Sequence, residues 1–309
     1  MGARYRVRRL EQNPIIVPHM DERMGANING PTLLRVPEWV SDPLGRYYLY
    51  FSHHNGTYIR LAIADAIEGP WRMHEPGTLQ HADSYFPPEL EPLDPAALPT
   101  GMVPPLPHIA SPDVHVDHAA GQVRMYYHGI LANRRQVTRV ALSADGLRFA
   151  AREEILGPSY FRVFRHGGWW YALAMPGVFL RSRDGLTGFE RGPTLFTHDM
   201  RHSAVFVDGD TLTVFYTVVG EAPERVVVSA IDLSGDWLSW REGPAEPVLE
   251  PEREYEGVDL PLVPSIRGEI TQRARQLRDP AVYREEGRTY LLYAVAGESG
   301  IAIAELSEQ

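Results

Sequence analysis

The residues of this 309-residue chain best suited to chemistry are carboxylates, imidazoles and guanidiniums that stand beside short apolar segments. Asn29, Asp113, His202 and Asp279 each lie at or near the start of such a segment. Carboxylic acids and imidazoles can transfer protons, bind hydroxyl groups or ligate metal ions. The chain has twelve histidines but no H-E-x-x-H motif, so a zinc site could form only where distant histidines converge.

These residues belong to a unit that the chain repeats five times. Each copy opens with a small or polar residue beside a proline or serine, and continues through an apolar strand, a turn, an aromatic-rich strand and a third strand. The copies start near residues 29, 111, 157, 202 and 279. The middle copies are spaced by roughly 45 residues, which is typical of a four-stranded blade. The sequence therefore predicts an all-β, five-bladed β-propeller that occupies residues 1–309 as one domain.

Two intervals between copies are longer than one blade requires. They predict insertions at about 73–110 and 241–277, both rich in proline and charge, as long functional loops often are. The last copy has only three strands before the chain reaches Gln309. We expect an N-terminal segment around Tyr5–Leu10 to supply its fourth strand and close the ring, because an unpaired edge strand promotes aggregation.

Propeller geometry predicts where the polar residues gather. The starts of the first strands share one end of the channel with the loops between second and third strands, and both insertions should lie at that end. The opposite end receives ordinary turn residues such as Gly121 and Gly209. The polar residues expected at the first mouth, or in the strands beneath it, are Asn29, His53, His54, Asp113, His115, His128, Arg201, His202, Arg278, Asp279 and Glu298. This asymmetry predicts a ligand pocket at that mouth.

Composition narrows the classes of partner. The formal net charge of −10 argues against nucleic acid and against an anionic membrane surface, because both need a basic face. There is no cysteine, which excludes disulfides. No apolar run approaches the ~20 residues of a membrane span, and residues 1–9 do not read as a secretion signal. We expect a cytoplasmic protein, and the sequence leaves the oligomeric state open.

The repeat pattern resembles the five-bladed propeller glycosidases, above all glycoside hydrolase family 43 and its relatives in families 32, 62, 68 and 117. The resemblance covers nearly the whole chain. Its sharpest local match is Leu277-Arg278-Asp279-Pro280-Ala281-Val282, followed by Gly287-Arg288-Thr289-Tyr290. The resemblance implies carboxylates at the channel mouth that serve as base or nucleophile, as acid, and as a group that tunes the pKa.

The chain departs from the family pattern at three blade starts. Gly30, Ser111 and Leu156 stand where the family has acidic residues, and Asp279 alone falls on a family position. Glycoside cleavage normally needs two carboxyl groups. We therefore predict catalysis by Asp113 and Asp279, because strand starts lie near the axis, with Glu256 of the second insertion as the candidate acid.

The expected substrate is a small carbohydrate, whose glycosidic bond is cleaved or transferred. Its predicted contacts are Asn29, His53, His54, His115, His128, Arg201, His202, Arg278 and Glu298. No cofactor is expected to be required, although calcium or another divalent ion in the central channel is an option and its ligands are unknown. Two alternatives stay open. One is a sugar-binding propeller without hydrolytic activity, and the other is a metal-dependent enzyme that uses a histidine cluster.

Overall fold

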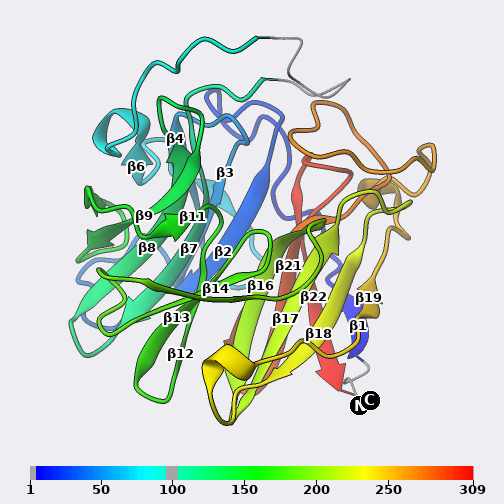
Figure 1. Ribbon diagram of the computed structural model, residues 1–309. Helices are drawn as coiled ribbons and strands as arrows, with labels where there is room; N and C mark the ends of the chain where they lie inside the picture. The colour runs from blue at the N-terminus through cyan, green and yellow to red at the C-terminus, as the bar shows by residue number, and fades with distance from the viewer. Residues whose placement is uncertain (1–4, 95–103, 309) are drawn as a thin grey trace.

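Five antiparallel sheets surround a central channel in the computed structural model, which describes residues 5–94 and 104–308 (Figure 1). The first blade contains β2 (Asn29–Arg35), β3 (Tyr47–Ser52), β4 (Tyr58–Ala64), β5 (Arg72–Met73) and β6 (Leu79–Gln80). The second contains β7 (Ile109–Asp117), β8 (Gln122–Ile130), β9 (Gln136–Ser143), β10 (Ala150–Ala151) and β11 (Gly157–Pro158). The all-β, five-bladed architecture predicted from the repeats is confirmed.

The other three blades have four strands each. The third contains β12 (Arg162–His166), β13 (Trp169–Ala174), β14 (Val178–Ser182) and β15 (Glu190–Thr194). The fourth contains β16 (Met200–Asp208), β17 (Thr211–Val218), β18 (Val226–Asp232) and β19 (Glu246–Leu249). The fifth contains β20 (Arg278–Glu285), β21 (Arg288–Ala294), β22 (Ile301–Glu308) and β1 (Tyr5–Arg9). Short 3-10 helices occur at η1 (His81–Asp83), η3 (Trp237–Ser239) and η4 (Glu254–Glu256).

The N-terminal strand closes the ring as predicted. β1 pairs antiparallel with β22, from Tyr5 opposite Glu308 to Arg9 opposite Ala304. This pairing covers the outer edge of the last blade and satisfies backbone groups that would otherwise be exposed. No helix among the described residues has the length and apolar character needed to cross a membrane.

Two predicted boundaries differ from the observed strands. Gly157–Pro158 pairs with β9 as a last short strand of the second blade, and the innermost strand of the third blade begins at Arg162. Part of the predicted 241–277 insertion forms β19, the outer strand of the fourth blade. Residues 95–103 of the predicted 73–110 insertion lie outside the described residues. In Figure 1 the described residues on either side of 95–103 (cyan) and the orange part of the second insertion, about residues 260–277, lie at the upper end of the molecule, and the two ends of the chain lie at the lower end.

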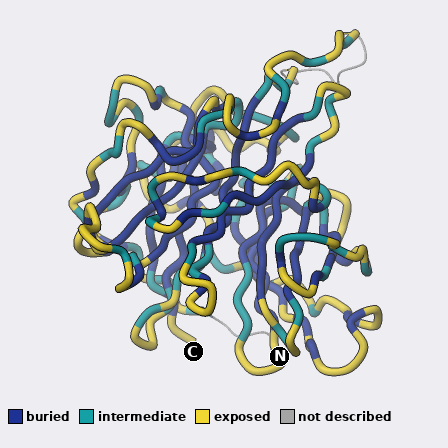
Figure 2. Tube along the Cα trace, turned by 90° about the vertical axis from the view of Figure 1, so that its left-hand side faces the viewer, coloured by how far each residue is buried: buried dark blue, intermediate teal, exposed yellow. Residues whose placement is uncertain are grey.

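Apolar side chains fill the spaces between neighbouring blades. β3 and β4 are buried along their whole length, because both faces of a blade pack against another blade. The chain trace in Figure 2 shows buried strands with exposed loops around them. Each neighbouring pair of blades encloses its own cluster of buried hydrophobic residues. Burial of one such large side chain contributes about 1.5–3 kcal/mol to folding, so these clusters hold the ring together.

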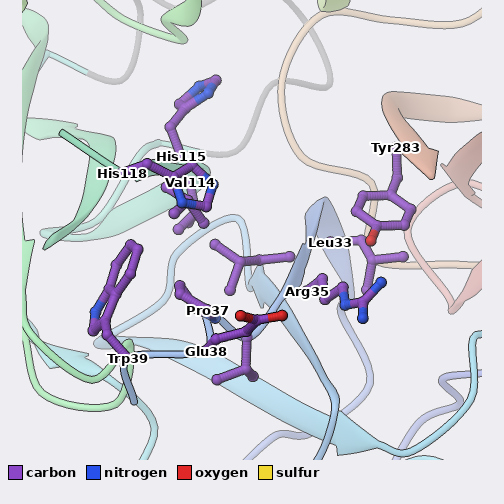
Figure 3. Close-up of a pocket in the computed structure, with 12 residues that line it drawn as sticks. Leu33, Arg35, Pro37, Glu38, Trp39, Val114, His115, His118 and Tyr283 are labelled. Carbon is purple, nitrogen blue, oxygen red and sulfur yellow. The ribbon is translucent and has the colours of Figure 1, made fainter. Parts of the chain in front are cut away.

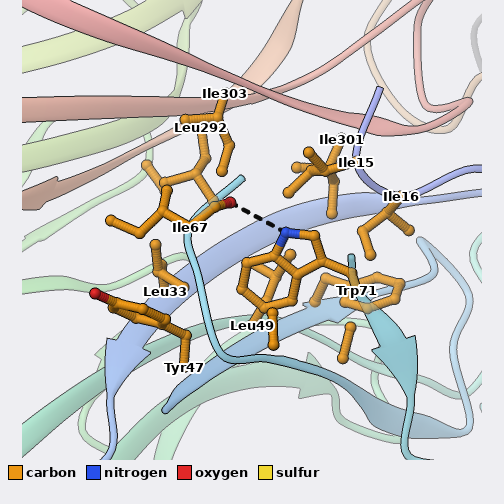
Figure 4. Packing of buried hydrophobic residues seen from close by; sticks show 14 of the residues in the cluster. Ile15, Ile16, Leu33, Tyr47, Leu49, Ile67, Trp71, Leu292, Ile301 and Ile303 are labelled. Atoms are coloured by element: carbon orange, nitrogen blue, oxygen red, sulfur yellow. Dashed lines mark hydrogen bonds between the residues drawn. The ribbon is translucent and has the colours of Figure 1, made fainter. Parts of the chain in front are cut away.

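The cluster between the first and fifth blades illustrates this packing (Figure 4). Trp71 lies among Leu49, Ile301 and Ile303, and its indole nitrogen donates a 3.2 Å hydrogen bond to the carbonyl oxygen of Ile67. Trp237 and Trp240 pack in the same way between the third and fourth blades. These tryptophans are therefore core residues.

Candidate functional site

Each innermost strand is entered through a residue with a positive φ angle. These five residues are Gly30 (58°), Ser111 (48°), Tyr160 (66°), His202 (51°) and Asp279 (47°). In four of the blades the register between first and second strands shifts at this point, which marks a β-bulge. Bulges re-aim side chains and are common beside functional sites. Left-handed backbone costs a non-glycine residue about 1–2 kcal/mol, so the fold holds four side chains here at the expense of stability.

A cavity of about 180 Å³ lies at this end of the channel, and every blade contributes to its wall. Its lining residues are Asn29, His54, Ala110, Ser111, His128, Gln136, Tyr160, Met175, Arg201, His202, Arg267, Gly268 and Asp279. Arg267 and Gly268 come from the second insertion, which therefore reaches the mouth of the channel. We call this cavity the upper pocket. It contains five of the residues predicted to bind substrate and one of the predicted catalytic residues.

Asp279 is the one carboxylate among the residues that line the upper pocket. Its side chain is almost completely buried, and its Oδ1 atom accepts a 2.7 Å hydrogen bond from the Tyr160 hydroxyl. Its Oδ2 atom is buried without a hydrogen-bond partner. Burial and the nearby carboxylate of Glu298 raise the pKa of Asp279 to about 6. A carboxyl group with one unpaired oxygen and a pKa near neutrality is suited to proton transfer.

A chain of paired charges runs from the pocket wall into the protein. Arg201 makes a bidentate ion pair with Glu224, with N–O distances of 2.8 and 2.5 Å. Arg278 bridges this Glu224, at 3.3 Å, and Glu298, at 3.0 Å. His54 completes the chain with its Nδ1 atom 3.4 Å from Glu298. Each charge in the chain has an opposite partner, which buried ions require.

This chain sets the ionisation of its members. Burial opposes the ionisation of Glu298, but His54, Arg278 and Asn27 together hold the pKa of Glu298 far below its usual range. Burial likewise opposes the protonation of His54, but the charge of Glu298 raises the pKa of His54. Glu298 therefore stays ionised, and the imidazole of His54 takes up a proton more readily than an ordinary histidine.

Two other histidines of the upper pocket are held neutral. Burial and the nearby Arg201 keep the pKa of His202 well below its usual range, and burial and His108 do the same for the pKa of His128. His202 lies with its Nε2 atom 4.0 Å from Oδ1 of Asp279. The Nδ1 atom of His128 is buried without a partner. Neutral imidazoles of this kind can hydrogen-bond a ligand hydroxyl.

Arg278, Glu298 and His53 were predicted to contact substrate, but they do not line the upper pocket. The first two belong to the buried charge chain. The backbone N–H of Asn55 donates a 2.9 Å hydrogen bond to Nδ1 of His53, and burial together with Arg60 lowers the pKa of His53 to about 4. These residues support the site from behind.

Asp113 is held inside the channel and does not line the upper pocket. Its Oδ2 atom is 2.7 Å from Nε2 of His115 and accepts a 2.7 Å hydrogen bond from the backbone N–H of Val163. Arg162 lies 4.0 Å from its other oxygen. Burial opposes its ionisation, but His115 and Arg162 lower the pKa of Asp113. The structure thus gives Asp113 fixed partners between the second and third blades and does not pair it with Asp279.

His115 lies at the other mouth of the channel, where a second cavity of about 480 Å³ is present (Figure 3). Arg35, Trp39, His118 and Tyr283 also line this lower cavity. The expectation that His115 contacts a ligand in the same pocket as His54 is thus corrected. The expectation that the opposite mouth carries only turn residues is also corrected.

Glu256 lies on the outer side of the fifth blade, and its predicted role as pocket acid is corrected. Its carboxylate is fully buried and accepts hydrogen bonds from Nε of Arg9 at 2.7 Å and from the Tyr293 hydroxyl at 2.8 Å. It also accepts the backbone N–H groups of Glu252 and Arg253. Glu256 therefore fastens the N-terminal strand to the second insertion.

Sequence reasoning missed several residues of the site. Tyr160 was not among the predicted site residues, yet its hydroxyl donates a hydrogen bond to Asp279. Glu269 of the second insertion is adjacent to Gly268, and its Oε2 atom accepts a 2.6 Å hydrogen bond from Asn55. Burial raises the pKa of Glu269. The position of each residue in the sequence could have indicated it: Tyr160 lies beside a blade start, and Glu269 lies in the second insertion.

Arg162 was also missed. It lies buried in the channel over the Tyr160 ring, with its guanidinium carbon 4.3 Å from the ring centroid. Its Nε atom donates a 2.8 Å hydrogen bond to the carbonyl oxygen of Ser203. Among the residues that the structure describes, no three histidine, aspartate or glutamate side chains form a group that could hold a metal ion.

Several solved structures with the same fold carry the names of glycoside hydrolases. The chain superposes with a TM-score of 0.60 on a family 43 β-xylosidase/α-arabinofuranosidase from a compost microbial metagenome, with 13% identity over 98% of this chain and 96% of that one. A family 43 enzyme from Xanthomonas citri gives 0.60, with 11% identity and 96% and 92% coverage. A putative glycoside hydrolase from Parabacteroides distasonis gives 0.65, with 11% identity and 100% and 98% coverage. The molecule is thus a five-bladed propeller with the fold of the family 43 glycosidases.

A nearer relative is known from sequence. The uncharacterized protein R118 of Acanthamoeba polyphaga mimivirus is 37% identical over 306 residues, which cover 91% of this chain and 83% of the viral protein. The chain belongs to the same family as R118. No protein-family model matches the chain.

Proposed function

We propose that this protein acts on the glycosidic bond of a small carbohydrate in the upper pocket, with Asp279 as the general acid. The observation that carries the proposal is the Oδ2 atom of Asp279, which is buried, unpartnered and part of a residue that borders the pocket. Because Tyr160 occupies Oδ1, the acidic proton belongs on Oδ2, where it can pass to the leaving oxygen. A cavity of about 180 Å³ suits a terminal sugar better than a polymer.

The second carboxylate of the proposed reaction is Glu269. Glu269 does not itself line the upper pocket, but Arg267 and Gly268, which precede it directly, do, and Asn55 holds its carboxylate through a 2.6 Å hydrogen bond. Glu298 is less suited to this role, because Asn27, His54 and Arg278 already occupy its oxygens. In the proposed reaction Glu269 activates water and Asp279 protonates the leaving group. Neutral His128 and His202 bind the sugar hydroxyls.

The test is a hydrolysis assay with a panel of aryl glycosides and short oligosaccharides. Removal of a general acid typically costs a factor of about 10²–10⁴ in rate, so Asp279→Asn should lose at least a hundredfold in kcat/KM. Asp208→Asn is the matched control, since Asp208 is exposed at the end of β16. Equal activity of Asp279→Asn and the unmodified protein would reject the assignment. Retained activity after treatment with a chelator would argue against the metal-dependent alternative.

A second candidate function is sugar binding without turnover. Gly30 and Ser111 favour it, since they occupy blade starts that are equivalent to Asp279 but carry no carboxylate. In that case the unmodified protein would bind a sugar in the upper pocket, and no member of the glycoside panel would be cleaved. Asp279→Asn would then change the affinity for sugar, and neither protein would show a hydrolysis rate.

A further inference from the structure

The charged side chains that border the upper pocket are mostly cations. Arg201, Arg267 and His54 line it, whereas Asp279 is the one lining carboxylate. The carboxylates that balance Arg201 and His54 are Glu224 and Glu298, and both are buried behind the wall. Arg201 and His54 therefore border the pocket with their N–H groups, whereas their counter-ions Glu224 and Glu298 do not border it.

These cations keep donor capacity that the protein does not use. Arg201 directs its Nε and Nη2 atoms to Glu224, and its Nη1 atom makes one 3.2 Å hydrogen bond to the carbonyl oxygen of Ile266. Arg267 uses only its Nη2 atom, which contacts Asp199 at 3.0 Å and His198. Its Nε and Nη1 atoms have no partner among the described residues. Guanidinium groups with free N–H donors are well suited to carboxylate and phosphate groups.

We propose that the ligand of the upper pocket carries an oxyanion, a carboxylate or phosphate group, which Arg267 and His54 bind at the pocket wall with Arg201 beside them. That the ligand is a sugar depends on the function proposed above, whereas the prediction of an oxyanion depends only on the arrangement of the arginines and His54. Two sources share this chemistry: an acidic substituent of the sugar itself, as in a hexuronic acid, and free inorganic phosphate bound next to a neutral sugar. Near pH 6 the partial protonation of Asp279 and the raised pKa of His54 both favour an anion.

Isothermal titration calorimetry on the full chain tests the oxyanion site directly. The probes are glucuronate and galacturonate, their neutral counterparts glucose and galactose, and inorganic phosphate alone. We expect one of the anionic probes to bind at least tenfold more tightly than the neutral sugars, and this preference should weaken with added salt. Preference for a uronate identifies the substituent as the source, and saturable binding of phosphate identifies free phosphate. Equal or weaker binding of all anions relative to neutral sugars overturns the proposal.

Two arginines of the second insertion provide a matched pair of variants. Arg267→Gln removes the charge at the pocket wall, on a partly exposed loop where misfolding is not expected. Arg273→Gln removes a charge from the same insertion, where the guanidinium contacts the carbonyl oxygen of Glu254. Anion affinity should fall at least fivefold in the first variant and stay unchanged in the second. An equal effect of both variants would show a general charge effect and would overturn the site.

The two proposals fail in different ways. Turnover of a neutral glycoside that is unaffected by Arg267→Gln leaves the proposed function standing and rejects the oxyanion. Tight anion binding that depends on Arg267, without cleavage of any uronide or neutral glycoside with or without phosphate, keeps the oxyanion site and rejects the hydrolytic function.

Discussion

The Tyr160 hydroxyl donates a 2.7 Å hydrogen bond to Oδ1 of Asp279, although the two residues are separated by 119 positions in the sequence. Tyr160 stands at the entry of the third blade and Asp279 at the entry of the fifth, so the hydrogen bond spans the fourth blade between them. The ring centroid of His202, at the entry of the fourth blade, is 5.5 Å from that of Tyr160. Both residues have positive φ angles, 66° and 47°. The bond leaves the second oxygen of Asp279 free, and the proposed chemistry depends on that oxygen.

The pH dependence of activity should report Asp279. The pKa of its carboxyl group is raised to about 6, chiefly by burial, and the proposed general acid must be protonated. We therefore expect kcat/KM to fall as the pH rises through about 6, by up to tenfold for each pH unit above it. The measurement is a pH profile with a glycoside from the assay panel. A rate that instead rises through pH 6 would assign Asp279 as the base.

Removal of the Tyr160 hydroxyl should shift that profile. The hydrogen bond from Tyr160 favours the ionised form of Asp279, so Tyr160→Phe should raise the pKa of Asp279 and move the falling limb of the profile to higher pH. Tyr126→Phe is the control, because Tyr126 is a buried tyrosine whose hydroxyl contacts the carbonyl oxygen of Gly185. It should lower the melting temperature without moving the limb. A limb that stays fixed in Tyr160→Phe would argue against the positioning role.

Ionisation of Asp279 should also lower the free energy of unfolding above pH 4. Its pKa rises from 3.8 to about 6 on folding, so the folded state holds the proton more tightly than the unfolded state. The free energy of unfolding therefore falls as the pH rises from about 4 to 6, by up to about 3 kcal/mol from this group. Asp279→Asn cannot ionise and should be more stable than the unmodified protein at pH 7. Urea unfolding at pH 4 and 7 measures this, and a difference that is equal at both pH values would contradict it.

Glu256→Gln should weaken the closure of the ring. The substitution leaves the guanidinium of Arg9, which is 11% exposed, without its buried partner. Breaking a buried ion pair in this way costs about 3–5 kcal/mol. Glu252→Gln is the matched control, because Glu252 contacts the same arginine at 2.8 Å but is 58% exposed, and it should cost less than about 1 kcal/mol. Chemical denaturation measures both. Similar losses in the two variants would show that Glu256 does not hold β1.

Gly30→Ala should destabilise the first blade at its entry. A β-carbon at Gly30 would lie 2.9 Å from Cα of Ser111, and the φ angle of 58° is unfavourable for any side chain. Gly121→Ala shares the unfavourable φ, 61°, but has no atom within 4 Å of the new β-carbon. Thermal unfolding should show a loss of about 1–2 kcal/mol for Gly121→Ala and a larger loss for Gly30→Ala.

The sequence by itself determined the ring. Five aromatic-rich repeats and a three-stranded last copy predicted five blades and the pairing of a segment around Tyr5–Leu10 on the last blade, because alternation is a local property of each strand and an open edge strand must be covered. It also located Asp279, His54 and His202 at one mouth, since each occupies a fixed position within its repeat.

Only the tertiary structure decided which of the predicted carboxylates border the pocket. Asp113 and Glu256 had suitable sequence positions, but the first is held by Val163 and His115 inside the channel and the second by Arg9 at the outer edge. Residue type and spacing do not specify such partners, because the partners come from other blades and from the path of an insertion. The unpaired oxygen of Asp279 follows from the same cause. It depends on a tyrosine two blades away, and only closure of the ring brings the two side chains together.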